Sequence, residues 1–242
     1  MEEKVQGLVV GSVNYGDNDK ILRIFTLEKG TVSARIKGVK KSGAKLKFAA
    51  EPFCLAEFTF TRIGDKRTVT GASLIDSFYP LREDLVKLFC GGTVSEFVKR
   101  FAKEEIISGG LFIDAVNALK LIAYGGEPPR SVLVGFLLES LKTVGYALDL
   151  KGCFKCGKEL DGRVFFDFTT GGFFCEECRE NGARKINLST YDALCAVENG
   201  QTIPDDMAFR ALRLLDYYLV NKTEESLTNL KELLKLTPTS AE

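Results

Sequence analysis

The sequence predicts an α+β protein in which an N-terminal β-barrel precedes an α-helical domain carrying an inserted four-cysteine hairpin. Three observations predict this arrangement. Short β-branched and aromatic segments fill the first 80 residues, apolar side chains recur at helical spacing after Pro80, and two C-x2-C pairs interrupt the helical part. We therefore expect domains at residues 1–80 and 81–242, with the hairpin inserted at residues 150–183.

The first 80 residues have the composition of strands separated by turns rich in Gly, Asp and Asn. Val32, Ala34 and Ile36 alternate with polar residues, as expected of a half-buried strand, and Phe58 and Phe60 lie on one face of another. Five short strands in this length fit a small closed barrel, with the OB-fold as first candidate. The predicted strands are Val5–Val13, Lys20–Leu27, Thr31–Gly38, Pro52–Ile63 and Arg67–Phe78.

After Pro80 the apolar residues recur at the spacing of helices that pack against other helices. A turn is expected at Gly125–Arg130, where Gly and Pro cluster. The predicted helical segments are residues 81–105, 131–146, 205–222 and 226–236.

Composition restricts the classes of function. The chain of 242 residues contains no histidine, which excludes Ser-His-Asp and Cys-His catalysis and histidine-rich metal sites. The acidic N-terminus is not typical of a secretory signal, and no apolar run reaches the roughly 20 residues of a membrane-spanning helix. Seven cysteines, four of them in tight pairs, favour metal binding in a reducing cytoplasm over a disulfide framework.

Cys153, Cys156, Cys175 and Cys178 predict one structural Zn²⁺ ion. Each C-x2-C turn offers two thiolates to a tetrahedral ion, and four protein ligands leave no open position for a catalytic water. An Fe–S cluster or unligated thiols are the alternatives. The remaining cysteines, Cys54, Cys90 and Cys195, are interpreted as small buried hydrophobic residues.

The formal net charge of zero hides a basic segment in the barrel. Residues 1–80 contain 13 Lys and Arg against 9 Asp and Glu, a net of +4, whereas the remainder contains 20 against 24, a net of −4. Small barrels commonly bind nucleic acid across one face, and scattered lysines suit backbone phosphates, although charge runs are often only solvated surface. Tyr15 is the more plausible exposed aromatic, since Phe58 and Phe60 are expected in the core. The candidate DNA-binding residues are Arg35, Lys37, Lys40, Lys41, Lys45 and Lys47.

Two other patterns carry no function. The segment from Gly38 to Gly43 resembles a P-loop, but its Lys comes one position late and Leu46 stands where Ser or Thr should bind Mg²⁺. Acidic pairs such as Asp205 and Asp206 are interpreted as residues of turns or helix ends. At the start of a helix, the helix dipole stabilises carboxylates.

The order of several segments resembles the RecO family of bacterial recombination mediators. The resemblance runs through "VNYGDNDKILRIFTLEKG", "IKGVKKSGAKL", "EPFCLAEF", "FYPLREDLVKL", "FLLESLKTVGYALDLKGCFKCG" and "CEEC" and covers essentially the whole chain. Asp17 departs from the Glu usual at this position, and some members of the family lack the cysteines. The family's basic stretch falls on Lys37, Lys40, Lys41 and Lys45.

The resemblance implies a non-enzymatic DNA repair and recombination protein, located in the cytoplasm and associated with the nucleoid. Proteins of this family bind single- and double-stranded DNA, anneal complementary strands, engage the single-strand-binding protein SSB and, with RecR, help load RecA. Two alternatives remain: a protein–protein adaptor with structural zinc, and a zinc-dependent nucleic-acid enzyme.

Overall fold

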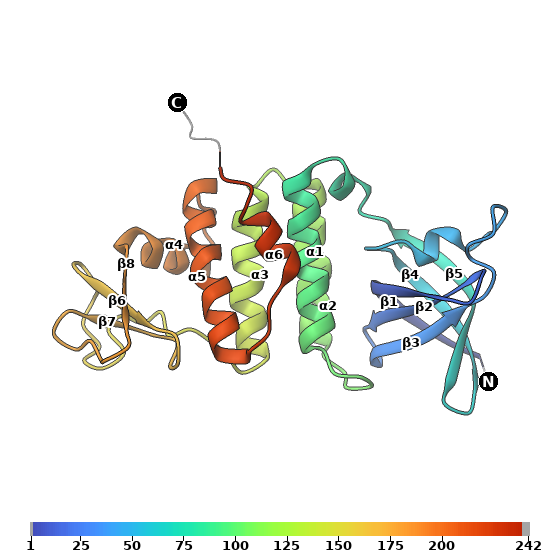
Figure 1. Cartoon of the computed structure of the whole chain (residues 1–242), viewed down its shortest axis with the longest axis horizontal. Helices are drawn as coiled ribbons and strands as arrows, with labels where there is room; N and C mark the ends of the chain where they lie inside the picture. Colours follow the sequence, from blue (N-terminus) through green and yellow to red (C-terminus); the bar gives the residue numbers. More distant parts are fainter. Residues whose placement is uncertain (1, 239–242) are drawn as a thin grey trace.

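The computed structural model describes residues 2–238, which form three parts in a row (Figure 1). A β-barrel, drawn in blue, lies at one end, and a bundle of helices occupies the middle. The four-cysteine segment, drawn in yellow and orange, lies at the other end. The barrel and the cysteine segment are therefore separated by the width of the helical bundle.

Five strands close the barrel in the order β1-β2-β3-β5-β4. Neighbouring strands are antiparallel except β3 and β5, which run parallel and pair over only three residues, Ala34–Ile36 against Arg67–Val69. This confirms the predicted barrel with its OB-type order. The strands are β1 (Glu2–Tyr15), β2 (Asp19–Thr26), β3 (Gly30–Ile36), β4 (Leu55–Ile63) and β5 (Lys66–Asp76).

The inside of the barrel contains the residues that the alternating pattern assigns to it. Val32, Ala34 and Ile36 of β3 are buried, and Phe58 and Phe60 of β4 stack in the core with ring centroids 6.0 Å apart. These two rings are therefore unavailable to stack on a ligand, as predicted. Burial of such side chains is the main favourable term in closing the barrel.

Most strand ends differ from the prediction by one to three residues, and two of these differences have a clear cause in the backbone. β4 begins at Leu55 rather than Pro52, because Phe53 adopts a left-handed backbone conformation (φ 63°) between the 3-10 turn η1 (Lys47–Ala50) and the strand. β5 ends at Asp76, two residues before Phe78 (φ 45°), and the 3-10 turn η2 (Tyr79–Arg82) follows. Both phenylalanines are buried, so packing outweighs the strain of the positive φ angles.

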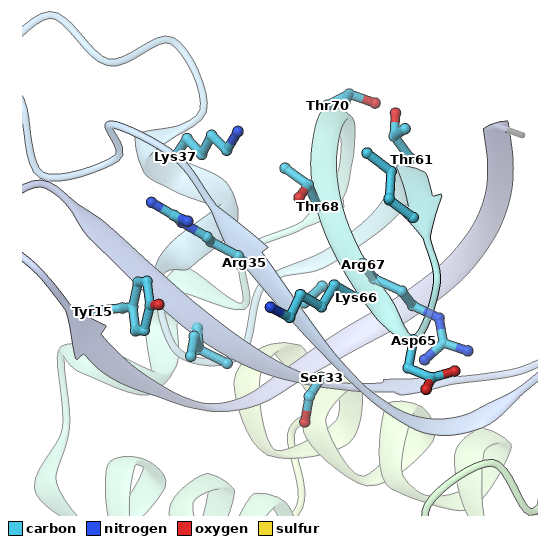
Figure 2. Close-up of a pocket in the computed structure, with 13 residues that line it drawn as sticks. Tyr15, Ser33, Arg35, Lys37, Thr61, Asp65, Lys66, Arg67, Thr68 and Thr70 are labelled. Carbon is cyan, nitrogen blue, oxygen red and sulfur yellow. The ribbon is translucent and has the colours of Figure 1, made fainter.

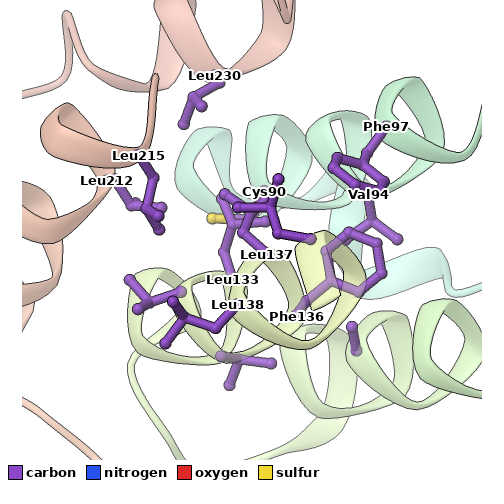
Figure 3. Packing of buried hydrophobic residues seen from close by; sticks show 14 of the residues in the cluster. Cys90, Val94, Phe97, Leu133, Phe136, Leu137, Leu138, Leu212, Leu215 and Leu230 are labelled. Atoms are coloured by element: carbon purple, nitrogen blue, oxygen red, sulfur yellow. The ribbon is translucent and has the colours of Figure 1, made fainter. Parts of the chain in front are cut away.

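Six α-helices follow the barrel within the described residues. α1 is capped by Asp84, whose carboxylate accepts the Lys87 N–H at 2.8 Å. Figure 3 shows the core where α1, α3 and α5 meet, with Cys90, Phe97 and Leu137 among the side chains that fill it. The helices are α1 (Leu85–Phe101), α2 (Gly109–Tyr124), α3 (Pro129–Thr143), α4 (Leu188–Glu198), α5 (Asp205–Thr223) and α6 (Thr228–Leu233).

The barrel docks on the helices through a second apolar face on its outside. Phe25 of β2 is fully buried and packs on Phe112 of α2 with ring centroids 5.6 Å apart. The segment after α1 also lies along β3, since the Glu105 N–H donates to the Thr31 carbonyl at 3.1 Å. Arg67 forms an ion pair with Glu105 at 2.7 Å. These contacts fix the barrel against the bundle. The division into domains 1–80 and 81–242 stays a prediction.

The cysteine segment forms a three-stranded sheet of order β7-β6-β8. Its hairpin bends at residues 168–171, and Phe166 packs edge-on against Tyr218 of α5 at 5.7 Å. The hairpin thus shares its core with the helices. The strands are β6 (Val164–Asp167), β7 (Gly172–Cys175) and β8 (Arg184–Ile186), and we call residues 150–187 the cysteine lobe.

None of the helices between residues 2 and 238 combines the length and the apolar character needed to cross a lipid bilayer.

Candidate functional site

The barrel strand β3 continues into residues 37–47, which we call the basic loop. Successive turns hold the loop: the Lys41 N–H donates to the Gly38 carbonyl and the Ala44 N–H to the Lys41 carbonyl, both at 3.1 Å. Val39 is buried in the barrel core, and the Lys40 N–H donates to the Asn18 carbonyl at 3.0 Å. The loop is therefore held to the barrel at its middle as well as its ends.

All five lysines of the basic loop are exposed, and within residues 2–238 none has a carboxylate partner within 4.0 Å. Their backbone is ordered by turns, while their ammonium groups remain available to solvent or to an anion. An exposed ammonium group on a flexible stem interacts with a phosphate as a point charge. They are Lys37, Lys40, Lys41, Lys45 and Lys47.

Arg35, the sixth candidate, has a different environment. Its guanidinium pairs with the Asp19 carboxylate, with Nε 2.7 Å from Oδ2, and lies 4.8 Å from the centre of the Tyr15 ring. Asp19 also accepts the Gly38 N–H at 2.7 Å. This backbone hydrogen bond and the Arg35 side chain lower the pKa of Asp19 below its usual value. Arg35 thus holds the start of the basic loop, and its charge is partly compensated.

A groove of about 630 Å³ runs between β3 and the β4–β5 hairpin, beside the basic loop (Figure 2). Arg35 and Lys37 line it from β3 and its end, and Lys66 and Arg67 from β5. Lys66 is exposed and, in the part of the chain that the structure describes, has no ion-pair partner. Lys66 was not predicted from the sequence, because it lies 25 residues beyond Lys41 and only barrel closure brings β5 beside β3.

The groove combines cations with neutral hydrogen-bond donors and apolar surface, and it also contains one carboxylate, that of Asp65. Hydroxyls of Thr61, Thr68 and Thr70 line it, and its rim carries Tyr15, with 48% of its surface exposed, and Ile63, with 79%. The exposure of Tyr15 agrees with the prediction. This set of groups can bind an extended chain that carries regularly spaced negative charges and flat apolar rings.

The second candidate site is formed by the four cysteines of the lobe. The sulfur atoms of Cys153, Cys156, Cys175 and Cys178 all lie within 4.8 Å of one another, and Sγ of Cys156 is 4.0 Å from Sγ of Cys175. Four sulfurs on one tetrahedral Zn²⁺, at about 2.3 Å from the ion, would be roughly 3.8 Å apart. The geometry brings all four predicted ligands together and can hold one metal ion.

Backbone groups around the first cysteine pair favour its thiolate. Burial opposes ionisation of Cys153, but N–H groups of Cys175, Cys156 and Lys155 outweigh it and lower the pKa of the Cys153 thiol to about 6. Gly157 takes φ +70°, which lets the turn close with its N–H donating to the Cys153 carbonyl at 2.8 Å. The turn therefore prepares a negatively charged sulfur for a cation.

The other three cysteines lie outside this cluster. Cys54 and Cys90 are buried, and burial raises the pKa of the Cys54 thiol to about 11 and that of Cys90 further. Cys195 is only half-buried, so the interpretation of all three as buried is wrong for this residue. Its sulfur faces the Leu150 carbonyl at 3.8 Å, at the base of the lobe.

Two family models match almost the entire chain. The model described as "Recombination protein O N terminal" matches residues 1–78, and "Recombination protein O C terminal" matches residues 82–231. The chain belongs to the RecO family. The two matches divide the chain between the end of β5 and the start of α1, and the second includes the cysteine lobe.

Curated relatives from several bacteria carry the name "DNA repair protein RecO". The RecO protein of Acetivibrio thermocellus is 32% identical over 193 residues, which cover 79% of this chain and 77% of the relative. That of Caldicellulosiruptor saccharolyticus is 27% identical over 194 residues, 80% and 79% of the two chains. That of Clostridium novyi is 25% identical over 223 residues, 89% and 87%. The resemblance that the sequence segments suggested is thus confirmed.

Proposed function

We propose that this RecO-family protein is a DNA repair and recombination mediator. It binds single- and double-stranded DNA and anneals complementary strands. With RecR it helps load RecA onto single strands coated by the single-strand-binding protein SSB, in the cytoplasm at the nucleoid. The names of the family and of its relatives support the role in repair. Annealing needs no covalent step, so the protein acts through binding energy alone and is not an enzyme.

One observation carries the proposal: an ordered loop of five exposed, unpaired lysines borders a groove on a closed barrel. We infer that these ammonium groups bind backbone phosphates. Phosphate contacts position a strand without reading its sequence, and they leave the base edges free to pair. A protein that anneals strands of any sequence requires both properties.

We propose further that the four cysteines of the lobe hold one structural Zn²⁺. The donor set of four sulfurs within 4.8 Å of one another suits Zn²⁺, which four thiolates would enclose completely. The bound ion supplies a cross-link between the Cys153–Cys156 turn and the Cys175–Cys178 turn. The chain's own residues contribute the N–H groups that stabilise thiolate and the aromatic core that joins the lobe to the helices.

The DNA-binding role is tested by replacing Lys40, Lys41 and Lys45 with Gln. Each phosphate contact to a single strand contributes a factor of about five at ~0.1 M salt, so loss of three should weaken binding of an oligonucleotide about 100-fold. Fluorescence anisotropy measures the affinity, and annealing of two labelled strands without ATP measures the activity. Both should fall together.

The matched control is Lys120→Gln, because Lys120 is an exposed lysine on α2, outside the barrel, and has no ion-pair partner among residues 2–238. It should change neither affinity nor annealing. If the triple variant binds and anneals like the wild type, the basic loop does not grip DNA, and a protein–protein adaptor becomes the better account.

A further inference from the structure

A second basic surface lies at the far end of the molecule from the barrel. A cleft of about 420 Å³ opens between β8 of the cysteine lobe and one face of α5, and we call it the lobe cleft. β8 contributes Arg184 and Lys185, while α5 contributes Arg210, Arg213 and Tyr217. The α5 residues are spaced three and four apart, so they follow one another along a single helix face.

The charge of the lobe cleft is opposite to that of its surroundings. Residues 81–242 carry a net charge of −4, yet the lining of this cleft contains four cations and no acidic residue. All four cations are exposed. Arg210 pairs with Asp206, and within residues 2–238 Arg184, Lys185 and Arg213 have no carboxylate partner within 4.0 Å. Three uncompensated cations therefore converge on one cleft.

An aromatic side chain lies among these cations. Tyr217 is 39% exposed, and its ring is held edge-on by Phe168 at 4.6 Å. The Arg184 guanidinium lies 4.8 Å from the centre of the same ring. A fixed ring beside a guanidinium plane is the kind of surface on which nucleic-acid bases stack.

We propose that the lobe cleft is a second binding site for a single-stranded polynucleotide, separate from the barrel groove. The choice of a nucleic acid as the occupant rests on the function proposed above. The combination of cations with an exposed aromatic ring favours a polynucleotide over an acidic peptide, because bases supply flat faces that acidic side chains lack.

The two sites lie on opposite ends of the molecule, with the helical bundle between them (Figure 1). α1 contacts α3, and α3 contacts α5, so at least two interhelical spacings, about 20 Å in all, separate them. One chain can therefore hold two DNA segments at once. This bridging raises the effective concentration of one strand near the other, which promotes annealing without further contacts.

The four cysteines couple to the lobe cleft through the sheet. β8 pairs with β6, and β6 pairs with β7, which ends at the ligand Cys175. A metal ion that fixes the hairpin therefore also fixes Arg184 and Lys185 against α5. The lobe cleft gives the metal site a role in DNA binding that the sequence alone did not reveal.

The test counts oligonucleotides bound per chain. Two short non-complementary DNA strands of about eight nucleotides, one carrying a donor and one an acceptor dye, are titrated against the protein at low salt. The wild type should bind two strands per chain and show energy transfer between the dyes. Sedimentation at the same concentration gives the number of chains in the complex, so that the count refers to one chain.

Lys185→Glu/Arg213→Glu should bind one strand per chain and lose the energy transfer. Both residues are exposed and, in the described part of the chain, have no ion-pair partner, so the fold should be kept, which circular dichroism checks. Lys120→Glu/Lys231→Glu makes the same change of net charge outside the barrel and the cysteine lobe and should still bind two strands.

The outcomes separate this inference from the proposed function. If the lobe variant still binds two strands, or if the wild type binds only one, the lobe cleft is not a DNA site. An acidic peptide would then be the better occupant. A barrel variant, Lys40→Glu/Lys41→Glu/Lys45→Glu, should keep only the strand in the lobe cleft. If instead it binds as the wild type does, the proposed role of the basic loop fails.

Discussion

Asp19 connects three parts of the basic surface that the barrel groove and the basic loop form. Its carboxylate pairs with Arg35 on β3 and accepts the Gly38 N–H at the start of the basic loop, while its own backbone belongs to β2. The negatively charged Asp19 thus stabilises the basic surface, because it fixes the backbone from which Lys37 and Lys40 extend. Arg35 stays a predicted DNA contact, but its first partner is this carboxylate.

We predict that Asp19→Asn destabilises the protein at neutral pH. Hydrogen bonds from Gly38 and Arg35 lower the pKa of the carboxyl in the folded state, so ionised Asp19 stabilises the fold above its unfolded pKa of about 3.9. This contribution is lost as the pH falls through the lowered folded value. The midpoints of urea unfolding of wild type and variant should therefore differ at pH 7 and differ less at pH 3. An equal gap at both pH values would contradict this assignment.

Individual site residues were predictable where the chemistry is local in the chain. The four cysteines and the lysines of the basic loop are close in sequence, so spacing and charge sufficed to select them. Lys66 and the cations of the lobe cleft were not predicted. Lys66 comes close to the basic loop only through strand pairing, and the cations of the lobe cleft come close to one another only through the packing of β8 on α5. A lysine on a β-hairpin looks like ordinary solvated surface until its neighbours are known.

At the scale of elements, the cysteine lobe combines the proposed metal site with an aromatic core. Its strands have only three or four residues each, and Phe166 and Phe173 are buried against the helices. So short a hairpin has too little core to be stable alone. The proposed ion and the contact with α5 are therefore both expected to stabilise the lobe.

Replacing Cys153 and Cys175 with Ser should release the metal and lower the melting temperature, while the barrel keeps its DNA contacts. Metal content is measured by a colorimetric chelator after denaturation, and unfolding by calorimetry. Cys195→Ser is the matched control, since Cys195 lies outside the cluster, and it should keep the metal. A double Ser variant that retains one ion per chain would refute the assignment of the ligands.

The junction between the barrel and the helices is a second element whose fit can be tested. Gly30 takes φ +66°, and a Cβ atom there would overlap the backbone of Ile106. Gly64 has a similar φ of +59° but nothing within 4 Å of the Cβ position. Alanine substitutions at these two positions therefore separate the cost of backbone strain from the cost of steric overlap.

We predict that Gly64→Ala costs about 1 kcal/mol of unfolding free energy, from the positive φ alone. Gly30→Ala should cost about 1–3 kcal/mol more, since the docked segment must move. Urea unfolding measures both. Equal losses would mean that the barrel does not need its close contact with the segment after α1.

Periodicity predicted whether most elements are helices or strands, but it did not predict the residues at which they begin and end. Five strands and four helical segments were predicted, but α2 and α4 were missed. α2 begins with two glycines and exposes Ile113 and Leu121 while burying other apolar residues, so its pattern lacks one clear stripe. The early end of β5 depends on the left-handed Phe78, a conformation that tertiary burial imposes and that no local preference predicts.

At the scale of the whole molecule, two basic surfaces lie at opposite ends of a chain with no net formal charge. The basic surface of the barrel could be predicted from the sequence, because its lysines lie close together along the chain. The other is assembled from β8 and α5 across an acidic domain. Such an arrangement suits a protein that brings DNA segments together, and the bundle with the docked barrel keeps the distance between them fixed.

The most direct test of the central claim is the salt dependence of binding to a single-stranded oligonucleotide. If the lysines of the basic loop contact phosphates, the logarithm of the association constant should fall linearly with the logarithm of the salt concentration. The slope is about −0.7 for each contact and near −3.5 if all five make one. Replacing Lys40, Lys41 and Lys45 with Gln should reduce the steepness by about 2. An affinity that is independent of salt, or an unchanged slope in the variant, would contradict the account.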